Sequence, residues 1–275
     1  MIVMVLSPAK TLDMSEVADD IESTQPMHLD DASELVDDAV SLVNQMLNKE
    51  GRCLQSASWT PEDLTFAQAH LRILCGLYGT LRPLDLIQAY RLEMGLKVQH
   101  GRGPKDGLYA FWGRAIADDI NAAFALPSTA SSSPPSSSIN ILLNVASVEY
   151  FKSVDVPSLD PSIVVVDCVF KDDGQIKSVF AKRARGLMVN YVVTSRAATM
   201  DHLRAFQADG YVYSRHESTD TQLVFNRSKA AAAAALKRAR EVAAIAKLQT
   251  KRPRNDLEMD TSVDEKPHKP SQRTM

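Results

Sequence analysis

The pattern of hydrophobic and polar positions predicts helices through most of the first half of the chain. Residues 1–6 (MIVMVL) are an exception, because an apolar run without polar alternation is typical of a buried strand. Over residues 30–47, apolar residues recur at steps of three and four, which is the spacing of an amphipathic helix. A Thr-Pro pair precedes a second helix, expected at about 64–75, and a third is expected at 108–126.

Strand patterns dominate the second half. Apolar and β-branched residues cluster at 139–145, 163–170 and 176–181, and an Asp-Asp-Gly turn between the last two predicts a hairpin. Two shorter strands are expected at 211–214 and 223–225. Because helices cluster early and strands late, the sequence predicts a mixed α/β (α+β) fold rather than a regular βαβ repeat.

Composition divides the chain into one globular domain and a tail. Residues 127–138 (PSTASSSPPSSS) cannot bury a core, so we expect a disordered surface insertion there. Six consecutive alanines at 230–235 begin a basic segment with high helix propensity but no wide apolar face. We therefore expect one domain over 1–227, followed at 228–275 by an exposed helix and a disordered tail.

Charge is unevenly distributed along the 275 residues, although the net charge is only −3. Residues 13–50 hold eleven acidic residues and one lysine, whereas 227–254 hold nine basic residues and one glutamate. The rest of the domain is nearly neutral, so it lacks the basic footprint of most nucleic-acid-binding domains. The acidic segment could sequester iron or a partner, but a solvated helix face is the simpler interpretation.

The chain carries no sign of a membrane or secreted protein. No apolar run approaches the ~18 residues of a membrane helix, and three scattered cysteines form neither a disulfide framework nor a zinc site. We expect a cytoplasmic protein, although the basic run from Lys251 to Arg254 also resembles a nuclear-localisation signal. The histidines show no metal-ligand spacing, and no nucleophile with a base can be assembled. We therefore predict no metal, no cofactor and no catalytic residue.

Polar residues follow two of the predicted strands. Ser7 and Lys10 come after the first strand and suit anion binding, although the Gly-rich cradle of a phosphate loop is missing and a solvated lysine is the simpler alternative. A second group follows the strand at 139–145, a position where open α/β sheets hold ligands. This group is Asn144, Ser147, Glu149 and Lys152. The alternative to a ligand site is that Ser147 caps the helix that follows.

Two further segments suit a phosphate-rich ligand. Gly76 and Gly79 separate two helical patterns, as in a helix–hairpin–helix module, where such glycines let the main chain approach a DNA backbone. An ordinary glycine cap and turn is the alternative. The flanking cations are Arg72, Arg82 and Arg91, the last of which could instead form a buried pair with an acid. The second segment is the run Lys182, Arg183 and Arg185, whose alternative is a solvated charged edge.

Taken together, these segments resemble the YaaA family of bacterial peroxide stress proteins. The resemblance covers most of 1–227, in the family's order. It is carried by SPAKTLD (7–13), FAQAHLRILCGLYGTLRPLDL (66–86), YRLEMG (90–95), LYAFWG (108–113), NVASVEYFKSV (144–154), AKRARGLM (181–188) and LVF (223–225). The chain departs from the family pattern where 49–65 is shorter, where 128–138 is inserted and where the basic tail is added.

The resemblance implies a single compact α/β domain with a mixed sheet and a helix–hairpin–helix element. It implies a cytosolic protein that limits damage under hydrogen peroxide stress, with a link to restraining reactive iron. It also implies binding of duplex and distorted DNA through the hairpin at Gly76–Gly79 and a positively charged cleft. The cleft cations would be Lys10, Arg72, Arg82, Arg91, Lys152, Lys182, Arg183 and Arg185. No enzymatic activity is carried over.

The residues leave a second hypothesis open, namely an enzyme or a binder of a small anionic ligand. One polar pocket would then be lined by Ser7, Lys10, Arg91, Asn144, Ser147, Glu149 and Lys182. Geometry separates the two hypotheses. Side chains that converge within hydrogen-bond reach favour the pocket, whereas cations along an open groove favour DNA.

Overall fold

The computed structural model describes residues 1–8, 24–28, 47–52, 59–90, 92–98, 107–125 and 139–250. Residues 1–235 form one compact unit, and 236–275 form a second unit that is described as far as residue 250. Most of the helix predicted at 30–47, the insertion at 127–138 and the basic run from Lys251 to Arg254 lie outside the described residues.

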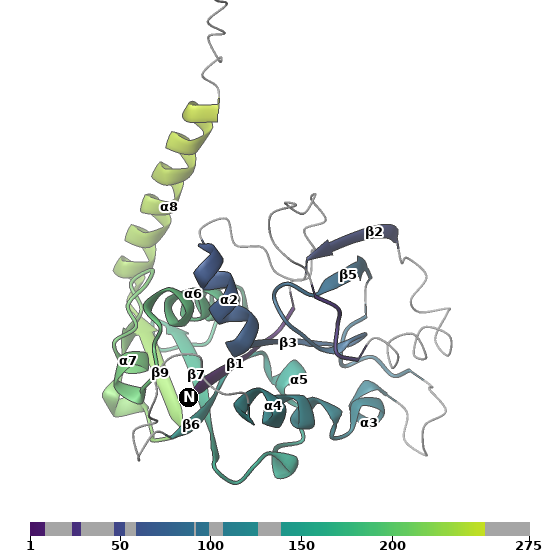
Figure 1. The fold of residues 1–275 in the computed structure, drawn as a ribbon. Coiled ribbons are helices and arrows are strands. Elements are labelled where there is room, and N and C mark those ends of the chain that lie inside the picture. The colour runs from purple at the N-terminus through teal and green to yellow at the C-terminus, as the bar shows by residue number, and fades with distance from the viewer. Residues whose placement is uncertain are drawn as a thin grey trace, which may run out of the picture. The chain divides into compact units, whose positions relative to one another are not determined.

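Among the described residues, seven strands form one mixed sheet in the order β4-β3-β1-β6-β7-β9-β8 (Figure 1). Neighbours run parallel except at the edges, where β4 pairs antiparallel with β3 and β8 with β9. β2 pairs with β5 in a separate antiparallel sheet. The strands are β1 (Ile2–Leu6), β2 (Leu47–Arg52), β3 (Leu71–Cys75), β4 (Gly79–Leu81), β5 (Leu86–Ala89), β6 (Asn140–Val145), β7 (Ile163–Asp172), β8 (Val212–Tyr213) and β9 (Gln222–Arg227). The predicted mixed α/β class is confirmed.

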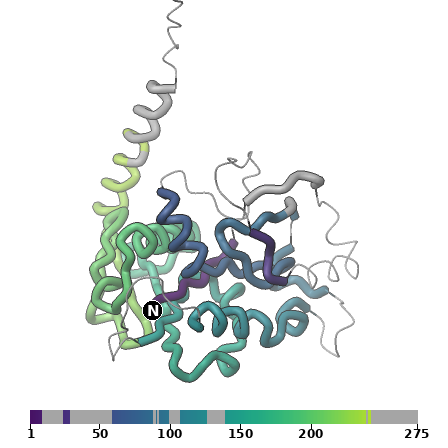
Figure 2. Tube along the Cα trace, in the orientation of Figure 1, coloured from purple at the N-terminus to yellow at the C-terminus, as the bar shows by residue number. Residues whose placement is uncertain are grey.

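Helices cover both faces of the sheet (Figures 1 and 2). α2 and α6 pack against each other, α2 contacts β1, and α6 contacts β6 and β7, whereas α4 packs on β1 and β4. Between these layers, Ile2 to Val5 of β1 are at most 2% exposed, as expected for a parallel strand covered on both faces. The helices are α2 (Pro61–His70), α3 (Leu108–Trp112), α4 (Ala115–Ala125), α5 (Val148–Phe151), α6 (Ser178–Ser195), α7 (Met200–Arg204) and α8 (Lys229–Thr250), with 3-10 turns η1 (Val156–Ser158) and η2 (Arg215–Glu217).

The glycine hairpin at Gly76–Gly79 joins two strands, so the helix–hairpin–helix element is not confirmed. The expected helix at 64–75 ends at His70, and its last five residues form β3, which runs parallel to β1 and is buried throughout. Gly79 has a φ of +67°, and a Cβ at Gly76 would lie 2.5 Å from the Leu92 carbonyl oxygen. These glycines therefore serve a tight turn and a close approach inside the domain.

Two other segments differ from the sequence prediction. The expected strand at 176–181 leads into and begins helix α6, so β9 rather than this segment pairs with β7. The single helix expected at 108–126 is divided into α3 and α4 at Gly113, whose φ is +48°. Of the described helices, none combines the length and apolar composition needed to cross a bilayer.

Candidate functional site

The candidate site lies at the carboxyl ends of β1 and β6, where the strand order reverses. The chain passes from β1 to β3 on one side and returns to β6 on the other side, and all three strands are parallel. In open α/β sheets, ligands bind in the crevice outside such a switch point. Ser7 follows β1 and Ser147 follows β6, so both residues stand at this position.

Ser7 and Ser147 contact each other directly. The Ser147 backbone N–H donates to Ser7 Oγ at 2.8 Å, and the Ser7 hydroxyl lies 3.3 Å from Ser147 Oγ. Ser147 is also the N-cap of α5, because its Oγ accepts from the Tyr150 backbone N–H at 3.4 Å. Capping, the alternative role considered for Ser147, is therefore present together with the convergence.

Asn144 links the end of β6 to β7. Its Nδ2 donates to Asp167 Oδ1 at 2.8 Å, and its Oδ1 accepts from the Ala146 backbone N–H at 2.9 Å. The first bond follows from the parallel register, which places Asn144 beside Asp167, whereas the second is a local contact two residues along the chain. Sequence reasoning missed Asp167, although an aspartate inside an otherwise apolar strand was a signal that it served a polar edge.

Arg185 supplies a partly buried positive charge near Cys168, the residue that follows Asp167 on β7. It lies on α6, and its Nε is buried without a hydrogen-bond partner among the described residues. Burial lowers the pKa of Arg185, whereas the neighbouring Cys168 opposes that shift. Burial also raises the pKa of the Cys168 thiol, an effect that Asp167 reinforces and Arg185 opposes. Because arginine keeps its proton, Arg185 is a cation whose buried donor has no described acceptor.

Three predicted cleft cations are occupied by ion pairs instead. Arg72 is 3% exposed, and its Nε bonds to Asp119 Oδ2 at 3.0 Å, so it stabilises the packing of β3 on α4. The Arg82 guanidinium binds Asp85 at 3.0 Å, and Arg183 binds Asp209 at 2.6 Å. A fully buried guanidinium cannot reach a solvated phosphate, so Arg72 is removed from the predicted DNA-contacting set.

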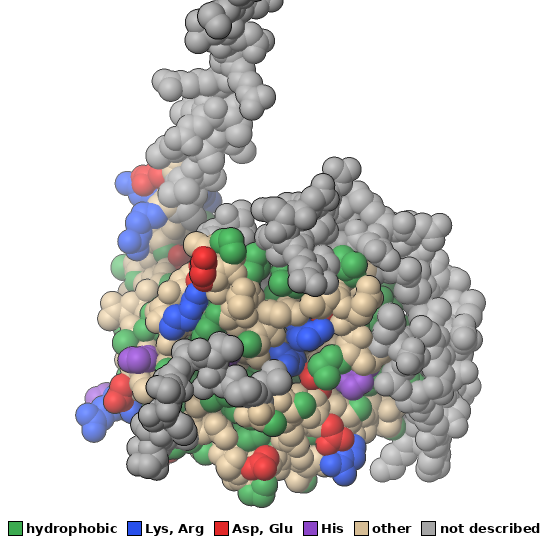
Figure 3. Space-filling model, in the orientation of Figure 1, with side chains coloured by type: hydrophobic (Ala, Val, Ile, Leu, Met, Phe, Trp, Pro, Cys, Tyr) green, Lys and Arg blue, Asp and Glu red, His purple; other side chains and the backbone are tan. Residues whose placement is uncertain are grey.

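The remaining predicted residues fall into separate places. Lys152 lies over the Tyr109 ring at 4.8 Å from its centroid, and the Glu149 carboxylate accepts from the Gly95 backbone N–H at 3.0 Å. Lys182 is exposed and has no ion pair with a described residue. Lys10 and Arg91 lie outside the described residues. On the face drawn in Figure 3, Lys and Arg side chains of the described surface stand in separate groups rather than in one continuous stripe.

The geometry therefore gathers Ser7, Asn144 and Ser147 with Asp167 at one edge of the sheet. It does not gather the cations in a single cleft. Among the described residues, no group of three His, Cys, Asp or Glu side chains is placed to hold a metal ion.

Comparison with known proteins gives the family. The family model of the peroxide stress protein YaaA matches residues 50–217 of this chain. This chain belongs to the YaaA family. The match includes Asn144, Ser147, Asp167 and Arg185, whereas Ser7 precedes it.

Curated relatives extend the similarity over nearly their whole length. A UPF0246 protein of Shewanella amazonensis is 37% identical over 268 residues, covering 82% of this chain and 99% of that protein. A UPF0246 protein of Burkholderia pseudomallei strain 668 is 39% identical over 269 residues, covering 82% and 98%. Membership of the YaaA family supports a role in peroxide stress, so the resemblance read from the sequence is confirmed.

Proposed function

We propose that this YaaA-family protein protects against peroxide stress by binding phosphate groups of DNA at the carboxyl edge of β1, β6 and β7. The observation that carries the proposal is the half-buried Arg185, whose Nε has no hydrogen-bond partner among the described residues. Lys182 lies three residues earlier on the same helix, so both cations share one side of α6. A phosphate oxygen would contact the half-buried Arg185 guanidinium and face the exposed Lys182 ammonium.

Recognition of this kind would depend on backbone charge rather than on base edges. Arginine and lysine contacts to phosphate position a protein on DNA without reading its sequence, and they make affinity depend strongly on salt. The proposed contact set is smaller than the sequence suggested, because Arg72 is buried against Asp119 and Arg82 and Arg183 are paired. Displacing Asp209 would free the Arg183 guanidinium for a further phosphate contact.

A small anionic ligand, bound or chemically converted, is the second candidate. The convergence of Ser7, Ser147, Asn144 and Asp167 within hydrogen-bond distance favours it. Such a compact polar edge at a switch point fits one small molecule. The same Arg185 donor would then bind a single free anion, and a bound duplex would be excluded by size.

The decisive experiment compares salt titrations of duplex and four-way-junction binding for the wild type, Arg185→Gln, and Lys182→Gln with Arg185→Gln. We expect the slope of log affinity against log salt to fall by about one for each phosphate contact removed. Arg204→Gln is the control, because Arg204 on α7 pairs with Asp201 away from this edge. Unchanged affinity and slope in the double variant would refute the DNA proposal, and protection from thermal unfolding by inorganic phosphate, lost in Arg185→Gln, would favour the second candidate.

The cellular role has its own test. Expressed in a bacterium that lacks its own YaaA-family gene, the wild-type chain should restore growth in hydrogen peroxide and lower the pool of chelatable iron. The double variant should fold but should neither restore growth in hydrogen peroxide nor lower the pool of chelatable iron. That result would connect the proposed phosphate site to protection. Full rescue by the double variant would separate the peroxide role from this site.

A further inference from the structure

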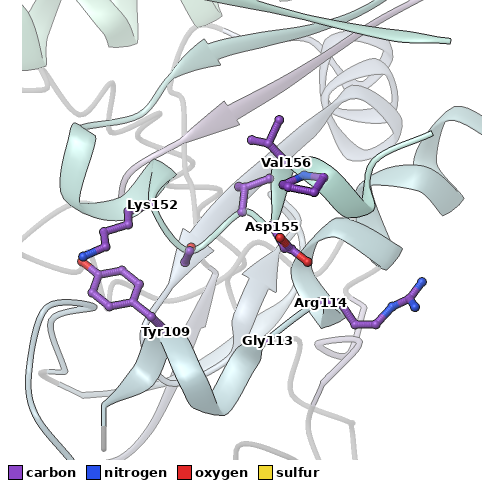
Figure 4. A pocket seen from close by; sticks show the side chains of 9 residues that line it. Tyr109, Gly113, Arg114, Lys152, Asp155 and Val156 are labelled. Atoms are coloured by element: carbon purple, nitrogen blue, oxygen red, sulfur yellow. The ribbon is translucent and has the colours of Figure 1, made fainter. Parts of the chain in front are cut away.

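A separate pocket lies between the α3–α4 corner and the segment that follows α5 (Figure 4). Its volume is about 410 Å³, which is within the size range of sites for small ligands. One side is formed by Tyr109 and Lys152, and the other by Asp155 and Val156. The pocket therefore combines two cations, Lys152 and Arg114, with one carboxylate and apolar surface.

On the first side, Lys152 offers hydrogen-bond donors that no described residue occupies. Its ammonium lies 4.8 Å from the centroid of the Tyr109 ring, and the Tyr109 hydroxyl holds that ring by donating to the Glu149 carbonyl at 2.9 Å. The Glu149 carboxylate, one turn before Lys152, accepts from Gly95 instead. Lys152 has no ion pair with a described residue, and a cation over an aromatic face keeps its N–H groups available for an anion.

Asp155 offers an acceptor on the opposite side. Its Oδ2 accepts from Ser158 Oγ at 2.6 Å, and its Oδ1 receives no hydrogen bond from a described residue. Arg114 also lines the pocket, but its Nε and Nη2 both bind Asp118 at 2.9 Å. In Figure 4, the Arg114 guanidinium points away from Lys152 and Tyr109.

We propose that this pocket binds a small zwitterion, with its carboxylate on Lys152 and its ammonium on Asp155. The Tyr109 ring, Val156 and Pro157 add apolar surface to the lining of the pocket and suit a short apolar side chain. An α-amino acid carries these three groups in one molecule. A polyanion is disfavoured, because Asp155 would repel a second negative charge, so Lys152 belongs to this pocket rather than to the proposed phosphate edge.

Three probes of nearly the same shape separate the charges. Leucine carries both, 4-methylpentanoate lacks the ammonium, and leucinamide lacks the carboxylate. By isothermal titration of the full chain, leucine should bind the wild type more tightly than either analogue, by about tenfold for one charge-assisted hydrogen bond. Lys152→Gln should remove that advantage over leucinamide, and Asp155→Asn should remove it over 4-methylpentanoate.

Lys171→Gln is the matched control, because Lys171 pairs with Glu217 on the β7 side of the domain and should leave leucine binding unchanged. No saturable leucine binding, equal binding of 4-methylpentanoate and leucine to the wild type, or equal weakening by Lys152→Gln and Lys171→Gln would each overturn the proposal. Circular dichroism of every variant establishes that it remains folded.

Discussion

The side-chain amide of Asn144 donates to the Asp167 carboxylate at 2.8 Å across the parallel strands β6 and β7. The same side chain accepts from the Ala146 backbone N–H at 2.9 Å, so it fixes the turn that presents Ser147 to Ser7. One asparagine thus joins two strands and the capped helix α5. The polar edge is organised by this residue before any ligand binds.

Replacing Asn144 should therefore destabilise the fold. Asn144→Ala leaves the Asp167 carboxylate and the Ala146 N–H without their partner, and we expect a loss of about 1–3 kcal/mol in the free energy of unfolding. Asn140→Ala is the matched control, since the Asn140 amide makes one exposed hydrogen bond of 3.4 Å to Ser162 and should change stability by less than about 0.5 kcal/mol. Urea denaturation measures both, and equal effects would contradict the prediction.

The buried Arg72–Asp119 pair should contribute to the stability of the fold but not to DNA binding. Asp119 also accepts from Thr80 Oγ1 at 2.7 Å, so Asp119→Ala leaves a buried guanidinium unpaired and should cost about 3–5 kcal/mol. Arg72→Met, which removes the cation itself, should retain the salt slope of any DNA binding. A fall of that slope in folded Arg72→Met would show that Arg72 reaches phosphate after all.

Three glycine-to-alanine variants separate two causes of strain. Gly79 has a φ of +67°, and in Gly79→Ala the added Cβ would lie 2.9 Å from the Trp112 ring. Gly174 has a φ of +76°, but in Gly174→Ala the added Cβ would have no contact within 4 Å. We expect Gly174→Ala to lose about 1–2 kcal/mol and Gly79→Ala to lose more, because the contact adds to the backbone cost.

Gly186→Ala completes the series as a control of opposite sign. Gly186 lies inside α6, and a Cβ there would meet no atom within 4 Å. Alanine should therefore stabilise the protein by about 0.5–1 kcal/mol, when thermal unfolding of all three glycine variants is compared with that of the wild type. Loss of stability in Gly186→Ala would contradict the packing described for this helix.

His70 should make stability depend on pH below about 6.5. Burial lowers its pKa below the ordinary value of 6.5, although its Nδ1 lies 2.7 Å from the Ile2 carbonyl oxygen, a contact that raises the pKa. Because the unfolded chain binds the proton more readily, stability is present at higher pH and is lost as pH falls from 6.5 through the lowered folded pKa.

The variant His70→Gln isolates this contribution. The midpoint of urea denaturation should fall more for the wild type than for His70→Gln when pH is lowered over that range. Parallel pH profiles for the two proteins would show that another group causes the dependence.

The strand ends show how far sequence patterning can locate a site. The sequence places Ser7 after the apolar run 1–6, and it places Asn144 and Ser147 at the end of the run 139–145 and just beyond it. Because carboxyl ends of parallel strands meet at one edge of a sheet, these residues are predicted to form a site. The prediction that Arg72 contacts DNA is wrong, because the sequence pattern around it does not identify the element on which it lies. Its neighbours follow an apolar pattern that a helix and a buried strand share, so the sequence did not show that β3 would place it against Asp119.

The segment 176–181 illustrates the limit of local propensity. Its residues favour a strand, but Ile176, which precedes α6, is 63% exposed, and Val179 and Phe180 in the first turn of α6 are 78% and 42% exposed. The position beside β7 is taken by β9, whose pairing depends on a contact distant in sequence. Competition for a sheet neighbour is a tertiary event that a local pattern does not contain.

By itself, the sequence determined the mixed α/β class, the YaaA family and the strand ends at which polar residues gather. These features could be predicted because local runs of apolar and β-branched side chains indicate buried strands. Only the tertiary structure decided which charges are available. Arg72 and Arg185 are both arginines in apolar surroundings, yet one faces a carboxylate and the other has a buried donor without a described acceptor. That difference depends on which elements pack together, because a charge is neutralised by neighbours in space rather than in sequence.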